Sequence, residues 1–473
     1  MKIPRHFFIG CLIFIFLGWS SFSVNALAIS IPDEKKLGKQ FMEMIREQRV
    51  ILHDPIARQM INTVGRNIQS VLPTQPFDYS FFLINDDNFN AFATPAANIF
   101  IHRGLIDALD NIDEFAGIMA HEIAHAASRH VSESIDRAKL VSFGTIAGML
   151  AGILIGNSGG GDAAKALTMG SMAAGQSSML AYTRENETEA DEKAILFLKQ
   201  VGYNPKGLLS GLTKLRESDY RGVEGIPDYF KTHPGTGKRI IHIAGILTDY
   251  TPDKDKKPTP DTFDFEMVKY RLMGLYGDLT KSFNNVENKL EKEPENPALH
   301  YGIGLLYARK NQRDLAIFHL QKALSIKIFD PMILVELGRI YIHQGRYEKA
   351  LDLLQGITED PVLEILAKYY MAIAQIESGN LISAEKNLKQ VLALEEEAYP
   401  RAYYHLANIM SQEKNQAMSH YYLGIYYDET RKLKNASHHL KKAVETLNNP
   451  EIKKDAEKRL TDILKSIKKK KYS

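Results

Sequence analysis

The chain has 473 residues, too many for one hydrophobic core, so two or three domains are expected. Its 59 Lys and Arg residues nearly balance 57 Asp and Glu residues, and this neutrality argues against nucleic acid as a partner. The one cysteine, Cys11, excludes an internal disulfide framework.

The first 28 residues have the pattern of a secretory signal peptide. Lys2 and Arg5 precede an apolar run from Phe7 to Trp19, and a short polar stretch then leads to Ala26-Leu27-Ala28. This order predicts cleavage after Ala28 and export of the mature chain. The alternative is an uncleaved membrane anchor, which the shortness of the apolar run disfavours.

Two amphipathic helices are predicted over residues 33–49 and 55–71, because apolar side chains recur there with helical spacing. Residues 77–83 alternate like a strand, and residues 98–102 form a second short strand. The second strand could also present an edge to which an extended peptide adds by backbone hydrogen bonds.

A helix over residues 113–134 carries the central motif, His121-Glu122-Ile123-Ala124-His125. Residues four apart lie on one face of a helix, so both imidazoles can reach a single ion. This is the HExxH pattern, in which two histidines bind Zn²⁺ and the glutamate takes a proton from the attacking water.

Residues 140–161 contain no charged side chain, and Gly144, Gly148, Gly152 and Gly156 recur there at a strict spacing of four. Such a glycine face allows very close packing against another backbone or a membrane helix. One interpretation is a hairpin that inserts into a membrane. We favour a closely packed segment near the cleft that makes at most a peripheral membrane contact.

The third metal ligand is expected from a helix over residues 178–201, which carries several acidic side chains. On composition the candidates are Glu185, Glu187, Glu189 and Glu192, although a charged helix is usually just a solvated face. Glu187 and Asp191 share one face, so one carboxylate could bind metal while the other orients a ligand histidine.

Taken in order, these motifs resemble the HtpX and CAAX-prenyl-protease-like zinc metallopeptidases. The resemblance rests on four stretches of the chain: Asn90-Ala91-Phe92, His121 to His125, Glu187 to Asp191, and His233-Pro234 with Arg239. It covers most of residues 30–245. This chain departs from the membrane members of the family because it lacks their several spanning helices.

The resemblance implies one Zn²⁺ held by His121, His125 and Glu187, with Glu122 as the base. Asp191 matches a second acidic position, described as a proton donor or as the residue that orients a ligand histidine. His233 matches a histidine that approaches the metal in some relatives. Asn90, Arg239 and His233 are thus candidates for regulation or for transition-state contacts, each with a simple structural role as the alternative. A structural role is expected for His130, which also follows the family pattern.

Behind a Pro-rich linker, residues 246–265, the sequence repeats itself every 34 residues. Gly304, Gly338 and Ala372 share one phase, and each is followed by an Ala 12 residues later and a Leu four residues after that. A fourth copy around Gly424 is displaced by an extra helix. This period is typical of tetratricopeptide repeats, which stack helical hairpins into a curved scaffold for a partner.

The predicted fold is mainly α: a zincin-like α+β metallopeptidase domain with a small β-sheet (residues 29–245), then an all-α tetratricopeptide-repeat solenoid (residues 266–473). The resemblance, with the predicted signal peptide, implies a periplasmic zinc endopeptidase that degrades misfolded or stalled envelope proteins. The resemblance further implies recruitment by the repeats of substrate or of the β-barrel assembly machinery, and an association with the outer membrane. The alternative is a chaperone or assembly adaptor with latent peptidase activity.

Overall fold

The computed structural model describes residues 29–48, 50–137, 182–220, 229, 232–252 and 264–472. The predicted signal peptide and the glycine-rich segment 140–161 lie outside these residues. Within the described ranges, no helix combines the length and the apolar character needed to cross a bilayer.

The N-terminal domain contains a small three-stranded sheet. Its strands are β1 (Ser80–Ile84), β2 (Ala91–Thr94) and β3 (Asn98–His102), in the order β1-β3-β2. β3 pairs parallel to β1 and antiparallel to β2. The expectation of a free edge on residues 98–102 is therefore wrong, because the short strand β2 covers that side and forms the edge itself.

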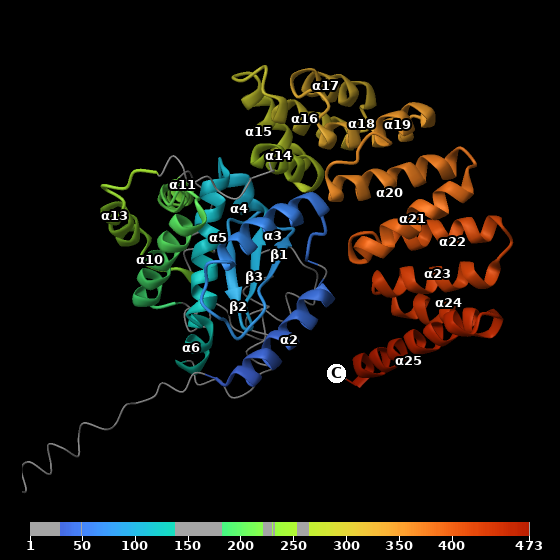
Figure 1. The fold of residues 1–473 in the computed structure, drawn as a ribbon, viewed down its shortest axis with the longest axis horizontal. Coiled ribbons are helices and arrows are strands. Elements are labelled where there is room, and N and C mark those ends of the chain that lie inside the picture. Colours follow the sequence, from blue (N-terminus) through green and yellow to red (C-terminus); the bar gives the residue numbers. More distant parts are fainter. Residues whose placement is uncertain are drawn as a thin grey trace, which may run out of the picture.

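Helices surround this sheet, with α5 at the centre of the domain (Figure 1). Thirteen of the sixteen residues of α5 are buried, because α3, α10, α11 and the sheet pack around it. The helices of this domain are α2 (Ile31–Gln48), α3 (Pro55–Gln69), α4 (Arg103–Ala108), α5 (Ile112–Ala127), α6 (His130–Arg137), α10 (Arg184–Val201), α11 (Lys206–Tyr220) and α13 (Thr236–Ile246).

The helix predicted over residues 113–134 is broken. α5 ends at Ala127, and Arg129 adopts the left-handed conformation with a φ of 56°, which no α-helix can contain. The Arg129 guanidinium donates to Glu34 and to the carbonyl of Ile29, so contacts with the N-terminal segment hold this break. α6 then begins at His130.

The acidic helix predicted from residue 178 begins at Arg184 as α10. Thr183 caps it, since its hydroxyl accepts from the backbone N–H of Asn186 while the Asn186 side chain accepts from the Thr183 backbone. This pair fixes where the helix starts, and hence which acidic side chains face the core.

The C-terminal half is a series of antiparallel helices joined by short turns. Its elements are α14 (Phe265–Tyr276), α15 (Leu279–Leu290), α16 (Pro297–Arg309), α17 (Arg313–Ile326), α18 (Pro331–His343), α19 (Tyr347–Leu354), α20 (Pro361–Glu377), α21 (Leu381–Glu395), the 3-10 turn η1 (Glu396–Ala398), α22 (Pro400–Gln412), α23 (Gln416–Glu429), α24 (Leu433–Thr446) and α25 (Pro450–Tyr472). The predicted fold class is confirmed.

The sequence period corresponds to one repeated contact between paired helices. A Cβ built on Gly304 would lie 2.9 Å from Leu320, and a Cβ on Gly338 would lie 2.8 Å from Leu354. Gly424 approaches Leu440 in the same way. At these three positions a larger side chain would therefore clash with the leucine of the partner helix.

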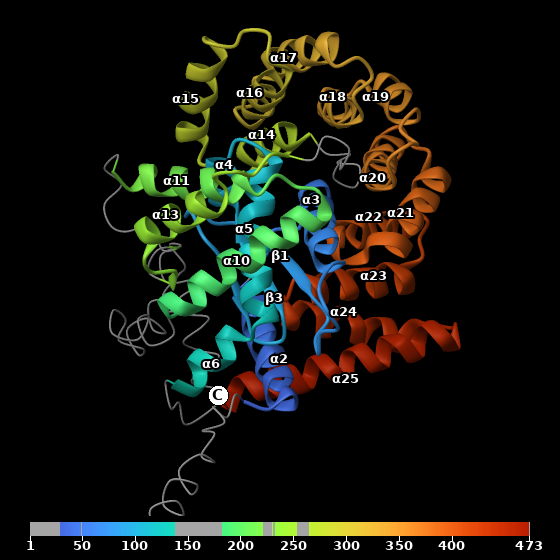
Figure 2. The same ribbon diagram turned by 60° about the vertical axis from the view of Figure 1, so that its left-hand side comes forward.

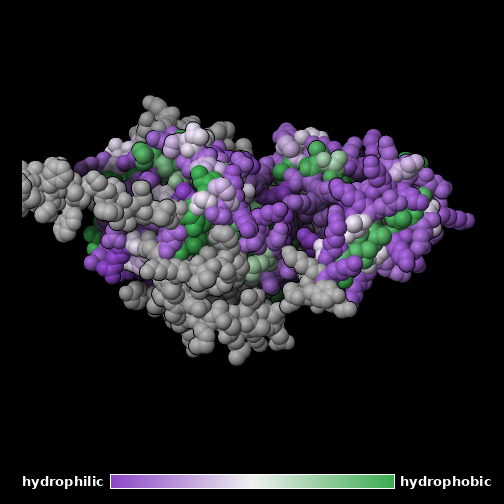
Figure 3. All heavy atoms as spheres, turned by 90° about the horizontal axis from the view of Figure 1, so that it is seen from below, coloured by the Kyte–Doolittle hydropathy of each residue, from purple (hydrophilic) through white to green (hydrophobic). Residues whose placement is uncertain are grey.

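The helical repeats curve around the N-terminal domain and return beside it (Figures 1 and 2). Arg271 of α14 anchors the two halves: its guanidinium donates to Asp54, at the start of α3, and to Glu336 of α18. All three side chains are buried. Seen from below, the repeat half shows a largely hydrophilic surface crossed by a narrow hydrophobic stripe (Figure 3).

Candidate metal centre

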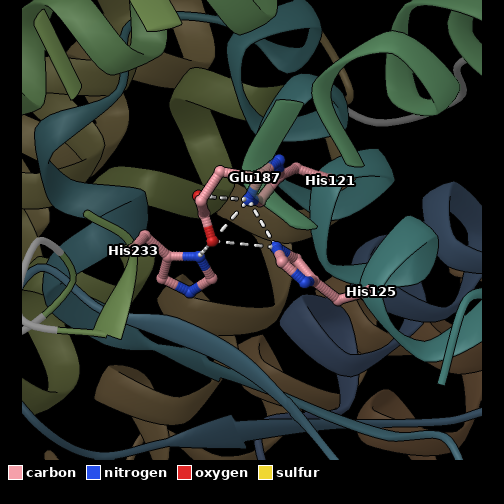
Figure 4. Close-up of side chains that lie close together, drawn as sticks. All are labelled: His121, His125, Glu187 and His233. Atoms are coloured by element: carbon pink, nitrogen blue, oxygen red, sulfur yellow. Dashed lines mark hydrogen bonds and ion pairs between the residues drawn. The ribbon is translucent and has the colours of Figure 1, made fainter. Parts of the chain in front are cut away.

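The two histidines of the HExxH motif point from one face of α5 into the interior. His121 Nε2 lies 3.0 Å from His125 Nε2, and both rings have no exposed surface. Their approach follows from the spacing of four residues, which places both side chains on the same face of the helix. Figure 4 shows the two rings converging on one point.

Two further side chains complete the cluster (Figure 4). Glu187, in the first turn of α10, places Oε1 3.3 Å from His125 Nε2. His233, just before α13, places Nδ1 3.1 Å from Glu187 Oε1 and 3.3 Å from His121 Nε2. All four side chains are fully buried.

These donors fit a metal ion. One ligand atom from each of the four residues lies within 4.8 Å of the others. Bonds of about 2.0–2.1 Å to a tetrahedral zinc ion would hold neighbouring ligand atoms roughly 3.3 Å apart. The contacts of 3.0–3.3 Å between neighbouring donors agree with that spacing. Imidazole nitrogens and a carboxylate oxygen are also the ligands that zinc accepts.

Arg239 and Asp191 form a second layer behind the cluster. The Arg239 guanidinium donates to both oxygens of Asp191, at 2.8 and 2.7 Å, and also contacts Glu187. Asp191 Oδ1 lies 2.9 Å from His121 Nδ1. The ring nitrogen of His121 that faces away from the cluster thus has a carboxylate to which it can donate.

Charge pairing controls the ionisation of these carboxyl groups. Burial alone would raise the pKa of Asp191, but Arg239 and His121 outweigh it and lower that pKa to about 2. Burial also opposes ionisation of Glu187, yet His233 and Arg239 bring its pKa well below the usual range. Both groups are therefore carboxylates at neutral pH.

Glu122 differs from its neighbours. It is fully buried, and among the described residues neither of its carboxylate oxygens has a hydrogen-bond partner. His233 Nε2 comes within 3.6 Å of Oε1. Burial raises the pKa of Glu122 above the ordinary value. A buried, unpartnered carboxyl of raised pKa is suited to exchanging protons with a substrate or with water.

The structure separates the four acidic candidates of α10. Glu187 is buried in the cluster, whereas Glu189 and Glu192 have half-exposed side chains and Glu185 is exposed. Asn90 is buried just before β2, and its side-chain oxygen has no hydrogen-bond partner among the described residues.

Sequence reasoning missed two aromatic side chains. The Tyr182 ring stacks on His125 with centroids 3.8 Å apart, and the Tyr229 ring stacks on His233 at 4.4 Å. Both tyrosines are buried. They pack the imidazoles from the side and restrict ring rotation. No spacing in the sequence marks them, because they lie outside the motif helices.

Known protein families and curated proteins match both parts of this chain. Residues 55–247 match peptidase family M48, and residues 297–327 match a tetratricopeptide repeat. The chain is 28% identical over 356 residues to the beta-barrel assembly-enhancing protease of Yersinia pestis, covering 72% of this chain and 71% of that protein. With its counterpart from Escherichia coli (strain K12) it shares 27% identity over 366 residues, covering 75% and 73%.

Another relative matches a smaller part of this chain. The metalloprotease LoiP of Escherichia coli is 28% identical over 195 residues, which is 40% of this chain and 68% of that protein. The alignments with the assembly-enhancing proteases run over 356 and 366 residues, so they extend beyond the stretch that matches family M48. The N-terminal domain therefore matches the metallopeptidases of family M48, and a tetratricopeptide-repeat match follows it in the chain.

Proposed function

We propose that this chain is a zinc-dependent endopeptidase whose ion is held by His121, His125 and Glu187, with Glu122 as the general base. The observation that carries the proposal is the buried cluster itself. Three donors from two helices converge at metal-ligand spacing, and Glu122, a carboxyl of raised pKa with no hydrogen bond among the described residues, lies on the same helix as two of them.

Zinc bound here would supply a Lewis acid that activates water and polarises the scissile carbonyl. Glu122 accepts a proton from the attacking water, because among the described residues no hydrogen bond occupies either of its carboxylate oxygens. The same carboxyl then delivers that proton to the departing amine, which its raised pKa favours.

Asp191 supports His121 in this proposal. Its low pKa keeps it ionised, which suits a hydrogen-bond acceptor for His121 Nδ1 and not a proton donor to the substrate. Arg239 fixes Asp191 by two hydrogen bonds and neutralises the second carboxylate, Glu187. Without that guanidinium the two buried carboxylates would repel one another.

For the biological role, we propose that the enzyme is exported to the periplasm, acts beside the outer membrane and degrades misfolded or stalled envelope proteins. The repeat domain would recruit either the substrate or the β-barrel assembly machinery. Support comes from the relatives, which are beta-barrel assembly-enhancing proteases and align with both domains. Helical repeats of this kind bind peptides and proteins.

The test is to compare the full-length chain with its Glu122→Gln variant for metal content and for cleavage of an unfolded protein such as casein. We expect unchanged zinc binding and a rate lower by about 10²–10⁴, the usual contribution of a general base. Glu192→Gln is the matched control, since Glu192 is a half-exposed carboxylate on α10. Undiminished cleavage by Glu122→Gln would refute the assignment.

A second candidate function is that of a chaperone or assembly adaptor whose peptidase activity is latent. His233 favours it, because its Nδ1 lies beside the proposed ligands His121 and Glu187 and would serve as a fourth ligand to a bound zinc, in place of water. While His233 binds, water and substrate would be excluded. Displacement of His233 would then switch the peptidase on.

Replacing His233 with Ala distinguishes the two functions. If His233 blocks the fourth position, the variant should cleave casein faster than the natural chain at equal zinc content. If His233 instead assists the reaction, the variant should be slower. Rescue of an envelope-assembly defect by Glu122→Gln would independently favour the adaptor.

A further inference from the structure

A second histidine lies directly behind one of the proposed ligands. His125 turns Nε2 toward the metal cluster and Nδ1 toward His130, whose own Nδ1 is 2.9 Å away. His130 begins α6 and is 2% exposed. The left-handed residue Arg129 between the two helices brings this ring back over α5.

This contact defines where the protons of both rings lie if a metal is bound. A metal-binding His125 Nε2 must present its lone pair, so the proton of the neutral ring is on Nδ1. That N–H points at His130 Nδ1, which must therefore accept. The single proton of a neutral His130 is then on Nε2.

The proton on His130 Nε2 has an acceptor. Glu189 Oε2 lies 3.4 Å from this nitrogen, and the other Glu189 oxygen accepts from Lys193 Nζ and, at 3.2 Å, from the Ser128 hydroxyl. Glu189 is half exposed, so it is a weaker support than a buried carboxylate. The contacts run in one direction: His125 donates to His130, and His130 donates to Glu189.

His121 has the equivalent arrangement in a shorter form. Its outward nitrogen faces the carboxylate of Asp191 directly, and Arg239 holds that carboxylate in place. Each histidine of the motif thus has a specific partner on the side away from the metal. For His121 this partner is an anion, whereas for His125 it is a neutral imidazole backed by an anion.

We propose that His130 is a positioning residue for the metal: as a hydrogen-bond acceptor it fixes the tautomer and the ring orientation of His125, with Glu189 fixing the tautomer of His130 in turn. This inference rests on the proposed function, because it presumes that His125 binds the metal through Nε2. Partners of this kind typically change metal affinity by 10- to 100-fold when they are removed.

The experiment measures the zinc dissociation constant of the full-length chain by competition with a chromophoric chelator. The variants are His130→Leu, His130→Asn and Glu189→Gln. Asn places an amide oxygen where His130 Nδ1 was, so it keeps the acceptor, whereas Leu fills the space without one. His242→Leu is the matched control, because His242 pairs with Glu192 and lies away from the cluster.

We expect His130→Leu to weaken zinc binding 10- to 100-fold, and His130→Asn to restore affinity to within a few-fold of the natural chain. Glu189→Gln should have a smaller effect than His130→Leu, since solvent can replace a half-exposed carboxylate. His242→Leu should bind like the natural chain. Thermal unfolding of the metal-free proteins shows whether each variant is folded.

The outcomes separate the two levels of inference. If the natural chain itself binds no zinc, the proposed function fails. If it binds zinc and His130→Leu binds equally well, the role of His130 is refuted. The role is also refuted if His130→Asn is as weak as His130→Leu, because the effect is then one of packing. If His130→Leu does not fold, the zinc affinities of His130→Asn and Glu189→Gln decide. The role of His130 is upheld if His130→Asn binds zinc as tightly as His242→Leu and Glu189→Gln binds it a few-fold more weakly.

Discussion

The metal cluster and the helical repeats are built in opposite ways. His121 and His233 are 112 residues apart in the chain and 3.3 Å apart in space, and their contact depends on α5, α10 and the approach to α13. In the repeats, Gly304 meets Leu320 within one helical hairpin, and Gly338 meets Leu354 likewise. The metal cluster depends on contacts between residues far apart in the chain, whereas the repeats depend on one short-range contact that recurs along the chain.

This difference predicts how each region responds to change. In the cluster, several buried charges neutralise one another, so the loss of one leaves the others unpaired in a medium that cannot solvate them. In the repeats, each hairpin contacts mainly its neighbours, so damage stays local and modest. Three substitutions probe the contrast, from the largest expected effect to the smallest.

Arg239→Leu should have the largest effect. It leaves Asp191 and Glu187 as buried carboxylates without their cation, and removal of one partner from a buried ion pair typically costs about 3–5 kcal/mol. We expect that loss in the free energy of unfolding of the metal-free protein, together with loss of peptidase activity. Chemical denaturation measures it, with Lys238→Leu, an exposed cation on the same helix, as the control. Equal stability of the two variants would contradict the charge-neutralisation argument.

Gly338→Ala should have a smaller and local effect. The new Cβ would lie 2.8 Å from Leu354, which overpacks this hairpin and typically costs about 1–3 kcal/mol. Gly356→Ala is the matched control, because a Cβ there meets nothing within 4 Å. Zinc affinity should stay within about twofold in both variants. A large loss of zinc affinity in Gly338→Ala would show that the two regions are more strongly coupled than their contacts indicate.

Lys269→Met should have the smallest effect, visible as a change in pH dependence. Lys269 of α14 donates to the carbonyl of Leu109, and burial, with a contribution from Lys289, lowers the pKa of Lys269 to about 8. Between that value and its ordinary pKa the unfolded chain binds more protons, so the natural protein gains stability as pH rises from 8 toward 10.5.

The variant should lose this gain. Its free energy of unfolding, measured relative to that of the natural chain, should therefore be higher at pH 7 than at pH 10 by roughly 1–3 kcal/mol. Unfolding free energies measured across this pH range test the prediction. The exposed Lys281 supplies the control, since Lys281→Met should leave the slope unchanged. A parallel profile for Lys269→Met would contradict the assigned pKa.

Much of the fold was predictable because it depends on local spacing. The four-residue spacing of His121 and His125 needs only helical geometry, and the 34-residue period needs only one repeated glycine–leucine contact. The strand at 98–102 was predicted with its correct bounds. β2 was missed, since it has only four residues and follows a stretch rich in turn residues.

The rest depends on contacts between segments distant in the chain. The break at Arg129 is held by Glu34 and Ile29, about a hundred residues away, and no periodicity records that. The choice of Glu187 among four acidic residues follows from the rotation of α10 that Thr183 and Asn186 set at its start. Neither Tyr182 nor Tyr229 could be assigned to the site, because only the folded chain brings them onto the imidazoles.

The anchor at Asp54 has a consequence for dissecting this protein. Asp54 caps α3, the helix beside the HExxH helix, and the same carboxylate accepts hydrogen bonds from Arg271 and from Tyr276 of α14. A chain shortened before α14 would lose both donors and uncover the flank of α3. If such a fragment were inactive, the cause could be destabilisation of α3 and of the HExxH helix beside it. The separate roles of the two domains are therefore better tested by substitutions in the outer hairpins of the intact chain.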